Sequence, residues 1–225
     1  MKILALSDQV VHSIYSPDMR ERYGDVDLVI GCGDLPYYYL EFITTMLSAP
    51  VVYVYGNHDK TQFTADGRTL NAAEGCRLID GRCVVVNGLI VVGLGGSRRY
   101  QPNAINQYTE REMWLRIVRL IPRLLYNRLR YGRFVDILVT HSPPYGIHDG
   151  TDLTHTGFKS LLTFMRYFRP RMMLHGHKHI YRRDTRFKTR FHDTLVVNVY
   201  PSHLFEWGGD DEQQQGHSPQ RPRGI

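Results

Sequence analysis

Four short apolar runs in this chain end at residue types that bind metal ions, and three of them reach a glycine first. The runs lead into Gly33-Asp34, Gly56-Asn57-His58-Asp59, His141, and the segment His175-Gly176-His177-Lys178-His179. Glycine lets the backbone turn sharply, and the carboxyl ends of parallel strands share one edge of a sheet, where α/β proteins place their sites. The repeated junction therefore predicts that these side chains converge on one metal centre.

The first 60 residues alternate between apolar strand patterns and helical patterns. Strands are expected at 2–7, 26–30 and 51–55, with helices at 17–24, begun by Ser16 as N-cap, and at 36–47. This alternation indicates βαβ units and a parallel sheet.

The middle of the chain changes character. Residues 76–94 read as an antiparallel meander that starts a second sheet, with turns at Asp80-Gly81 and Asn87-Gly88. A long helix is expected over 109–131, opened by a capping box of Thr109 and Glu112 and kinked or broken by Pro122. The remaining patterns predict strands at 134–139, 171–174, 181–191 and 194–199, a helix at 156–168, and one domain over 1–207 with a disordered tail at 208–225.

The bulk properties narrow the class of protein. The length of 225 residues suits one globular domain, and no apolar run approaches the length of a membrane span or a signal peptide. The three cysteines have no paired spacing, so we expect reduced thiols, a cytoplasmic location and no membrane partner. The formal net charge of +6 favours anionic substrates. Nothing indicates an oligomeric state.

The candidate ligands are carboxylate, amide and imidazole groups: Asp8, Asp34, Asn57, His141, His177 and His179. A mixed oxygen and nitrogen set without thiolate suits manganese, iron or zinc better than a structural cysteine-type zinc site. The two oxygens of Asp34 can bridge two ions, and two ions can bind one phosphate between them.

The order of these motifs resembles that of the calcineurin-like metallophosphoesterases. That family carries D-x-H, G-D, G-N-H-(D/E), H and G-H-x-H, and the match runs over residues 1 to about 200 in the same order. The resemblance implies an α/β fold, a four-layer α-β-β-α sandwich of two mixed sheets flanked by helices. It also implies a two-metal phosphoester hydrolase.

The resemblance further implies a role for each motif residue. Asp8, Asp34 and His179 would hold the first ion, while Asp34, Asn57, His141 and His177 would hold the second. His58 would act beside the substrate as general acid or charge stabiliser, and Asp59 would orient it. A metal-bound hydroxide would attack the phosphorus atom.

The chain departs from the family pattern at one position, where Val10 replaces the histidine of D-x-H. Valine cannot bind a metal, so we expect the first site to be weakened, selective for a different ion, or completed by water. Gln9 and His12 are the conceivable replacements. On an extended strand, however, Gln9 would point away from Asp8 and His12 would lie roughly 13 Å beyond it.

Several residues have less specific interpretations. His148 and His155 fit a solvated loop better than substrate contact, and His175 fits a buried histidine next to the ligands. The arginines of 109–131, with Arg98-Arg99, fit the solvated face of a helix, although they could instead cap the site.

Three function classes remain open from the sequence. The favoured one is a metal-dependent phosphoesterase acting on a small phosphomonoester or phosphodiester. A non-catalytic, protein-binding relative is supported only by Val10. A nuclease is supported only by the basic helix, so nucleic acid is the less favoured partner. The sequence does not choose the substrate or the metal.

Overall fold

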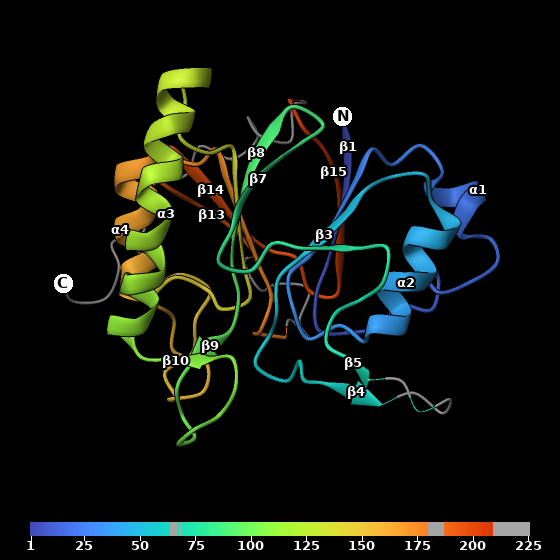
Figure 1. Ribbon diagram of the computed structural model, residues 1–225, viewed down its shortest axis with the longest axis horizontal. Helices are drawn as coiled ribbons and strands as arrows, with labels where there is room; N and C mark the ends of the chain where they lie inside the picture. The colour runs from blue at the N-terminus through green and yellow to red at the C-terminus, as the bar shows by residue number, and fades with distance from the viewer. Residues whose placement is uncertain (64–66, 68, 180–186, 209–225) are drawn as a thin grey trace.

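The computed structural model describes residues 1–63, 67, 69–179 and 187–208. Two β-sheets pack face to face, and each is covered by two helices on its outer side (Figure 1). Helices α1 (Met19–Tyr23) and α2 (Tyr37–Met46) cover one sheet, and α3 (Glu110–Tyr131) and α4 (Lys159–Phe168) cover the other. The predicted α-β-β-α sandwich is confirmed. No helix in these ranges is long and apolar enough to cross a membrane.

The first sheet has the strand order β15-β1-β2-β3-β6. Its strands are β1 (Lys2–Leu6), β2 (Leu28–Gly31), β3 (Val51–Tyr53), β6 (Arg77–Leu78) and β15 (Ser202–Glu206). The first four are parallel, as expected from the βαβ pattern, and β15 runs antiparallel to β1. The sequence did not predict β15, which brings the far end of the chain back beside the first strand.

The second sheet has the order β13-β14-β12-β11-β8-β7. Its strands are β7 (Cys83–Val86), β8 (Leu89–Leu94), β11 (Ile137–Thr140), β12 (Met172–His175), β13 (Lys188–Phe191) and β14 (Thr194–Asn198). The β7–β8 hairpin turns at Asn87-Gly88, both with positive φ, as predicted. The predicted meander is only partly present, because β7 and β8 pair antiparallel in the second sheet whereas β6 pairs parallel with β3 in the first.

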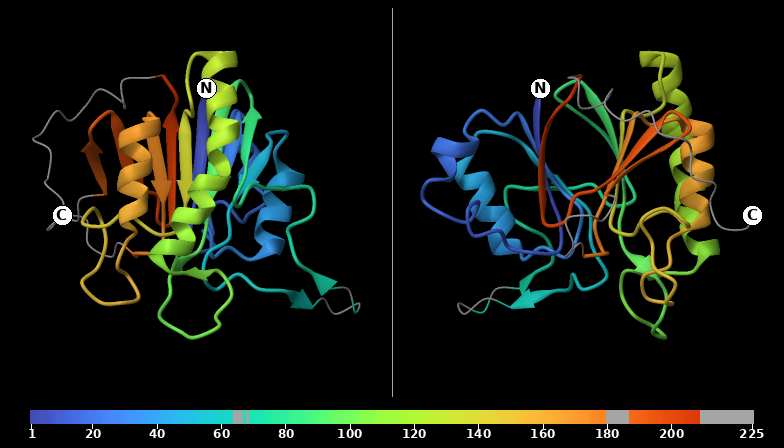
Figure 2. Two further views of the ribbon diagram at one scale, coloured as in Figure 1. Left: turned by 60° about the vertical axis from the view of Figure 1, so that its left-hand side comes forward. Right: turned by 180° about the vertical axis from the view of Figure 1, so that it is seen from behind.

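Two small ribbons lie at the end of the molecule where the parallel strands finish (Figures 1 and 2). One pairs β4 (Gln62–Phe63) with β5 (Thr69–Leu70), and the other pairs β9 (Ser97–Arg98) with β10 (Gln107–Tyr108). The sequence predicted neither ribbon. Both lie at the end of the sandwich that carries the candidate site.

The core is divided by the alternation of side chains along each strand. On β1, Ile3 and Ala5 face the second sheet, while Leu4 and Leu6 face α1 and α2. A third cluster lies between the second sheet and α3 and α4. Strands buried on both faces explain why the apolar runs of the sequence are continuous rather than alternating.

The helix boundaries differ from the predictions in three places. The N-cap of α1 is Asp18 rather than Ser16, whose backbone carbonyl accepts from the Met19 N–H. Helix α4 starts at Lys159, because Phe158 is held by backbone hydrogen bonds to Pro143 and Tyr145.

The third difference concerns α3. Its capping box of Thr109 and Glu112 is confirmed, but the helix continues through Pro122 without a break. Ile117, Leu120 and Leu124 stay buried on both sides of the proline, so packing outweighs its missing hydrogen bond. The predicted disordered tail lies, from residue 209 on, outside the described residues, as does 181–186 of the predicted strand 181–191.

Candidate metal centre

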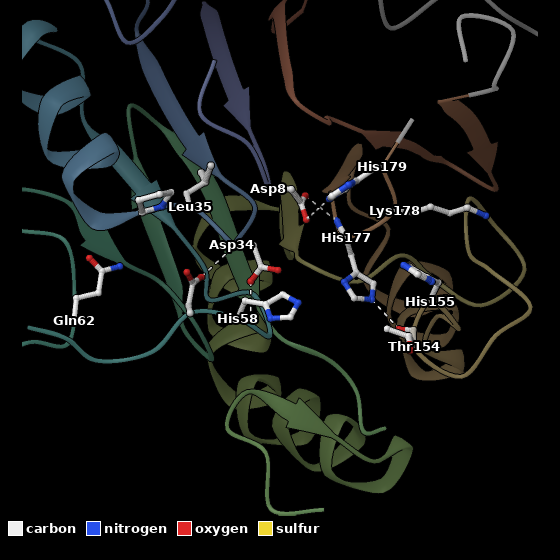
Figure 3. Close-up of a pocket in the computed structure, with 12 residues that line it drawn as sticks. Asp8, Asp34, Leu35, His58, Gln62, Thr154, His155, His177, Lys178 and His179 are labelled. Carbon is white, nitrogen blue, oxygen red and sulfur yellow. Dashed lines mark hydrogen bonds and ion pairs between the residues drawn. The ribbon is translucent and has the colours of Figure 1, made fainter. Parts of the chain in front are cut away.

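Each predicted ligand follows the carboxyl end of a parallel strand, and both sheets contribute. Asp8 comes after β1, Asp34 after β2, Asn57 after β3, His141 directly after β11, and His177 and His179 after β12. These ends meet at a cleft of about 690 Å³, with Asp34 and His58 on one wall and His155 and His177 on the other (Figure 3). The two sheets therefore bring together residues from opposite ends of the sequence.

Three of the ligand positions adopt left-handed backbone conformations. Asp8, Asp34 and His177 have φ of 64°, 53° and 65°, which non-glycine residues rarely adopt. At Asp8 and His177 the next N–H donates to the preceding carbonyl, at 2.7 and 2.8 Å, which makes a γ-turn. The chain thus reverses immediately after the strand and points the side chain into the cleft. Strain of this kind concentrates at functional sites.

Glycine is required where the ligand loops interlock. A Cβ at Gly176 would overlap the Ser7 hydroxyl and the Asp8 carboxylate. At Gly33, where φ is +91°, it would lie 2.8 Å from Nδ1 of His141. The glycines of the sequence motifs therefore allow loops from different strands to approach each other, in addition to turning the chain.

Three ligand groups converge on one nitrogen of His141. Its Nε2 lies 3.0 Å from Asn57 Oδ1, 3.0 Å from His177 Nδ1 and 3.3 Å from Asp34 Oδ2. The other His141 nitrogen, Nδ1, donates to the Cys32 carbonyl at 2.9 Å. His177 likewise donates from Nε2 to the Thr154 carbonyl at 2.8 Å. Because carbonyls only accept, the inward atoms are Nε2 of His141 and Nδ1 of His177, which are the nitrogens available to a cation once the His141 imidazolium gives up its Nε2 proton.

The electrostatics of this cluster also fit a cation. Burial lowers the pKa of His141, but Asp34 and Asp8 outweigh it and raise the pKa to about 9. Burial and the neighbouring His141 lower the pKa of His177 to about 3. Burial raises the pKa of Asp34, and His141 outweighs this effect and lowers it to about 2. A single proton on His141 thus balances the acceptors, and a divalent ion would replace it.

The ligands assigned to the first ion are less well enclosed. Asp8 Oδ1 lies 3.6 Å from His179 Nε2, and the His179 side chain is 40% exposed. The His179 ring stacks on Tyr200, with centroids 4.4 Å apart. The other oxygen of Asp8 accepts from the His177 N–H at 3.0 Å and from the Ser7 hydroxyl. Asp8 and Asp34 still lie with His141 in one group whose ligand atoms are within 4.8 Å of one another.

Neither conceivable replacement for the missing histidine, Gln9 or His12, lines the cleft. Val10 is partly buried against the apolar cluster under α2, and His12 is exposed and does not line the cleft. The Gln9 side chain accepts a hydrogen bond from the Tyr200 hydroxyl at 2.8 Å. The first half of the centre is therefore left with Asp8, His179 and a shared Asp34.

His58 and Asp59 have distinct surroundings. His58 is exposed and lines the cleft, and its backbone N–H donates to Asp34 Oδ1 at 2.8 Å. Asp59 accepts from the Gly56 N–H at 2.7 Å and the Asp34 N–H at 3.0 Å, rather than from the His58 imidazole. Burial and the nearby Asp34 raise the pKa of Asp59 to about 6. Asp59 therefore fixes the two ligand loops relative to each other.

The loop of residues 146–157 forms part of the opposite wall, and the solvated interpretation is wrong for His148. Its Nδ1 lies 3.0 Å from Nε2 of the fully buried His175, and its Nε2 lies 2.8 Å from the Thr189 hydroxyl. His155 lines the cleft, and its Nδ1 lies 2.9 Å from an Asp152 carboxylate oxygen. This loop thus supports the ligand segment from behind and also faces the cleft.

The arginine-rich helix does not cap the site. No residue of α3 is among those that line the cleft, and α3 lies on the outer face of the second sheet (Figure 2). Arg98 and Arg99 form ion pairs with Glu110 and Glu112, at 2.7 and 3.1 Å.

Two groups that orient ligands at the site were not predicted from the sequence. Tyr100, in the loop between β9 and β10, accepts through its hydroxyl from the Asn57 amide nitrogen at 3.2 Å. The Thr154 carbonyl orients His177. Neither position carries a motif, and only the fold brings these loops to the strand ends.

Comparison with known proteins agrees with this geometry. A family model described as calcineurin-like phosphoesterase matches residues 1–181. The uncharacterised protein MJ1162 of Methanocaldococcus jannaschii is 26% identical over 215 residues, which cover 91% of this chain and 90% of that protein. The crystal structure of TT1561 of Thermus thermophilus is 14% identical, with a TM-score of 0.58 and 88% of each chain covered. At 14% identity, the similarity to TT1561 shows a shared fold alone.

Proposed function

Because the chain belongs to the calcineurin-like phosphoesterase family, we propose that it is a metal-dependent hydrolase of a small phosphomonoester or phosphodiester. The observation that carries the proposal is the convergence of Asp34, Asn57 and His177 on Nε2 of His141. This cluster lies within reach of a cleft that also exposes the imidazole of His58.

The two sets of ligand residues would differ in how tightly they hold their ions. Asp34, Asn57, His141 and His177 would hold one divalent ion, and manganese, iron or zinc suits their oxygen and nitrogen atoms. Asp8, His179 and the shared Asp34 would hold the other ion, the first ion of the sequence analysis, more weakly. When bound, the metal supplies Lewis-acid chemistry, which polarises a phosphoryl oxygen and makes water a better nucleophile.

The protein groups around the cleft have separate tasks. His58 is tied to Asp34 through its backbone, and its imidazole has no hydrogen-bond partner within the described residues, so it is available to donate a proton to the leaving oxygen. His155, oriented by Asp152, faces the substrate from the other wall. Asp59 keeps the loops of Asp34 and Gly56 in register.

The size of the cleft favours a small ester. Its volume of about 690 Å³ is within the range of small-molecule sites. Leu35 and Pro36 add an apolar portion to the wall beside the ligands, suited to an organic group attached to the phosphate. The net charge of +6 attracts anions toward the protein.

The test is hydrolysis by the manganese-loaded protein of bis-p-nitrophenyl phosphate, p-nitrophenyl phosphate and cyclic nucleotides. His58→Ala should lower kcat by about 100-fold or more while the metal content stays unchanged, as expected for loss of a general acid. Asn57→Ala should lose metal and activity together. His12→Ala, an exposed histidine outside the cleft, is the matched control and should change neither. Activity that survives both site substitutions would show that the site is misassigned.

A non-catalytic, protein-binding relative is the second candidate, favoured by Val10 and by the exposure of His179. The intact Asn57, His58 and His177 argue against it. Tight metal binding without turnover of any of these esters would support it. The nuclease interpretation finds no support in the position of α3, whose arginines lie away from the cleft.

A further inference from the structure

Helix α3 exposes a row of apolar side chains on the face that points away from the sheet. We define the outer stripe as Trp114, Leu115, Val118, Leu125 and Leu129, whose exposed fractions run from 41% to 88%. At 3.6 residues per turn these positions fall within about 100° of arc, on a face turned about 140° from that of the buried Met113, Ile117, Leu120 and Leu124. The helix therefore has two apolar faces, of which the fold buries one.

This exposure is concentrated rather than scattered. Of the fifteen large apolar side chains exposed within the described ranges, seven lie on α3, the two besides the outer stripe being Tyr126 and Tyr131. Single exposed apolar residues need no explanation, but a contiguous patch of this kind marks a surface that another body covers. The helix is also an outermost element of the molecule, as the views from two further sides show (Figure 2).

The charge around the outer stripe has one sign. Together α3 and α4 carry eight arginine and lysine side chains and two glutamates, an excess equal to the formal net charge of the whole chain. Both glutamates lie in the first turn of α3 and are paired with Arg98 and Arg99. Arg111, Arg119 and Arg130 form no ion pair with any described residue.

We propose that the outer stripe docks on an anionic lipid bilayer, with the axis of α3 lying along the membrane surface. An apolar stripe flanked by arginines is the pattern of helices that lie in the bilayer interface. Each basic residue near an anionic surface adds attraction to it. Trp114 within the stripe and Tyr126 at its edge are of the residue types enriched at that interface. A convex, outermost helix can meet a flat surface without any rearrangement of the fold.

The charge pattern disfavours the other occupants. A second copy packed on the same stripe would bring two arginine-rich faces together, and no unpaired carboxylate on α3 or α4 could neutralise them. A nucleic acid would satisfy the arginines but would desolvate the apolar centre of the stripe without a partner for it. No residue of α3 lines the cleft, and α3 lies on the outer side of the second sheet (Figure 1), so docking through α3 leaves the cleft accessible from water.

The first test is co-sedimentation of the full chain with vesicles of phosphatidylcholine, alone or with about one third phosphatidylglycerol. Binding is expected only to the anionic vesicles. Leu125→Glu with Leu129→Glu should weaken it about tenfold or more, since both side chains must enter the interface. Ile105→Glu, an exposed apolar residue in the loop between β9 and β10, outside the outer stripe, is the matched control and should bind like the wild type. Leu129→Glu alone, at an 88% exposed position, is included because the double variant could misfold. This single variant should also weaken binding to the anionic vesicles.

The charge requirement is tested separately. Arg119→Gln with Arg130→Gln should weaken binding and flatten its salt dependence. Arg20→Gln with Arg82→Gln removes the same charge from exposed positions on α1 and before β7, and should have a smaller effect. Equal loss in both pairs would mean that net charge alone attracts the protein, which would overturn the docking of α3.

The orientation is read from tryptophan fluorescence. The chain has two tryptophans, so Trp207→Phe leaves Trp114 as the only reporter. Anionic vesicles should shift its emission to the blue and protect it from acrylamide. An unshifted emission on bound vesicles, or no vesicle binding at all, would overturn the proposal. So would a dimer that Leu129→Glu dissociates in the absence of lipid, since it would assign the stripe to a second copy.

Discussion

The two halves of the metal centre differ in how firmly their ligands are held. In the half assigned to the second ion, His141, His177 and Asn57 are at most 8% exposed, and a further group orients each of them. In the other half, the His179 side chain is 40% exposed and lies 3.6 Å from Asp8, and Val10 stands where the motif resemblance implies a ligand. Ligands that are oriented in advance bind metals more tightly, so the halves should differ in affinity.

Two ligand residues of the same motif can therefore have unlike surroundings. His177 and His179 belong to the same short segment, yet the γ-turn at His177 buries its ring against His141. His179 instead lies beyond the turn and stacks on Tyr200. The spacing of a metal motif therefore identifies the ligand types, while the turn between them decides which ligand is enclosed.

The largest expected effect comes from removing a ligand in the enclosed half. His141→Ala deletes the nitrogen on which three other groups converge, so metal affinity should fall by more than about 100-fold. His179→Ala should leave the tight ion in place and lower affinity by less than about tenfold. Isothermal titration calorimetry with manganese measures both. Equal losses in the two variants would remove the asymmetry between the halves.

The second effect is a dependence of metal affinity on pH. Because the pKa of His141 is raised to about 9, an entering ion displaces a proton throughout the neutral range. Affinity of the enclosed half should therefore rise about tenfold per pH unit until the pKa of about 9 is reached and then level off. His177, with a pKa lowered to about 3, contributes no such dependence near neutrality. Calorimetry in buffers of different ionisation heat should detect close to one released proton; none would contradict the assigned role of His141.

Restoring the family residue should strengthen the weaker half. Val10→His should raise the affinity for the second-bound ion by about tenfold, because it adds the missing ligand type, at a cost of roughly 1–3 kcal/mol in stability from burying an imidazole. Val11→His, in the same apolar cluster, is the matched control and should lose stability without gaining affinity. Equal affinities in the two variants would mean that Val10 is not directed toward the site.

The smallest effect is expected at Tyr100. Tyr100→Phe removes the hydroxyl that accepts from the Asn57 amide, so Asn57 is free to rotate and the tight ion should bind at most about tenfold more weakly. Tyr200→Phe, which removes a hydroxyl beside the weaker half, should leave the tight ion unaffected. Metal competition with a fluorescent chelator resolves changes of this size.

The sequence predicted the elements whose signals are local. Apolar runs, the hairpin at Asn87-Gly88 and the capping box of Thr109 all appear in the structure, and the motif residues follow strand ends as expected. Strand β15 was missed because Ser202, His203 and Glu206 dilute its apolar character, and its pairing with β1 stabilises it only in the fold.

Contacts between distant loops could not be predicted in the same way. The bonds of Asp59 to Asp34, and of Tyr100 to Asn57, depend on how loops pack at the strand ends. The outer stripe of α3 could not be predicted from the sequence for a different reason. A helical period in a helix with two apolar faces does not reveal which face is buried.

The central claim is that one ion is held tightly by Asp34, Asn57, His141 and His177 and the other weakly. The most direct measurement is the number of manganese ions per chain as free metal is raised after complete chelation. Manganese should bind in two steps separated by about 100-fold or more, with the tighter step lost in His141→Ala and kept in His179→Ala. Two ions bound with equal affinity, or a tight ion that survives His141→Ala, would contradict it.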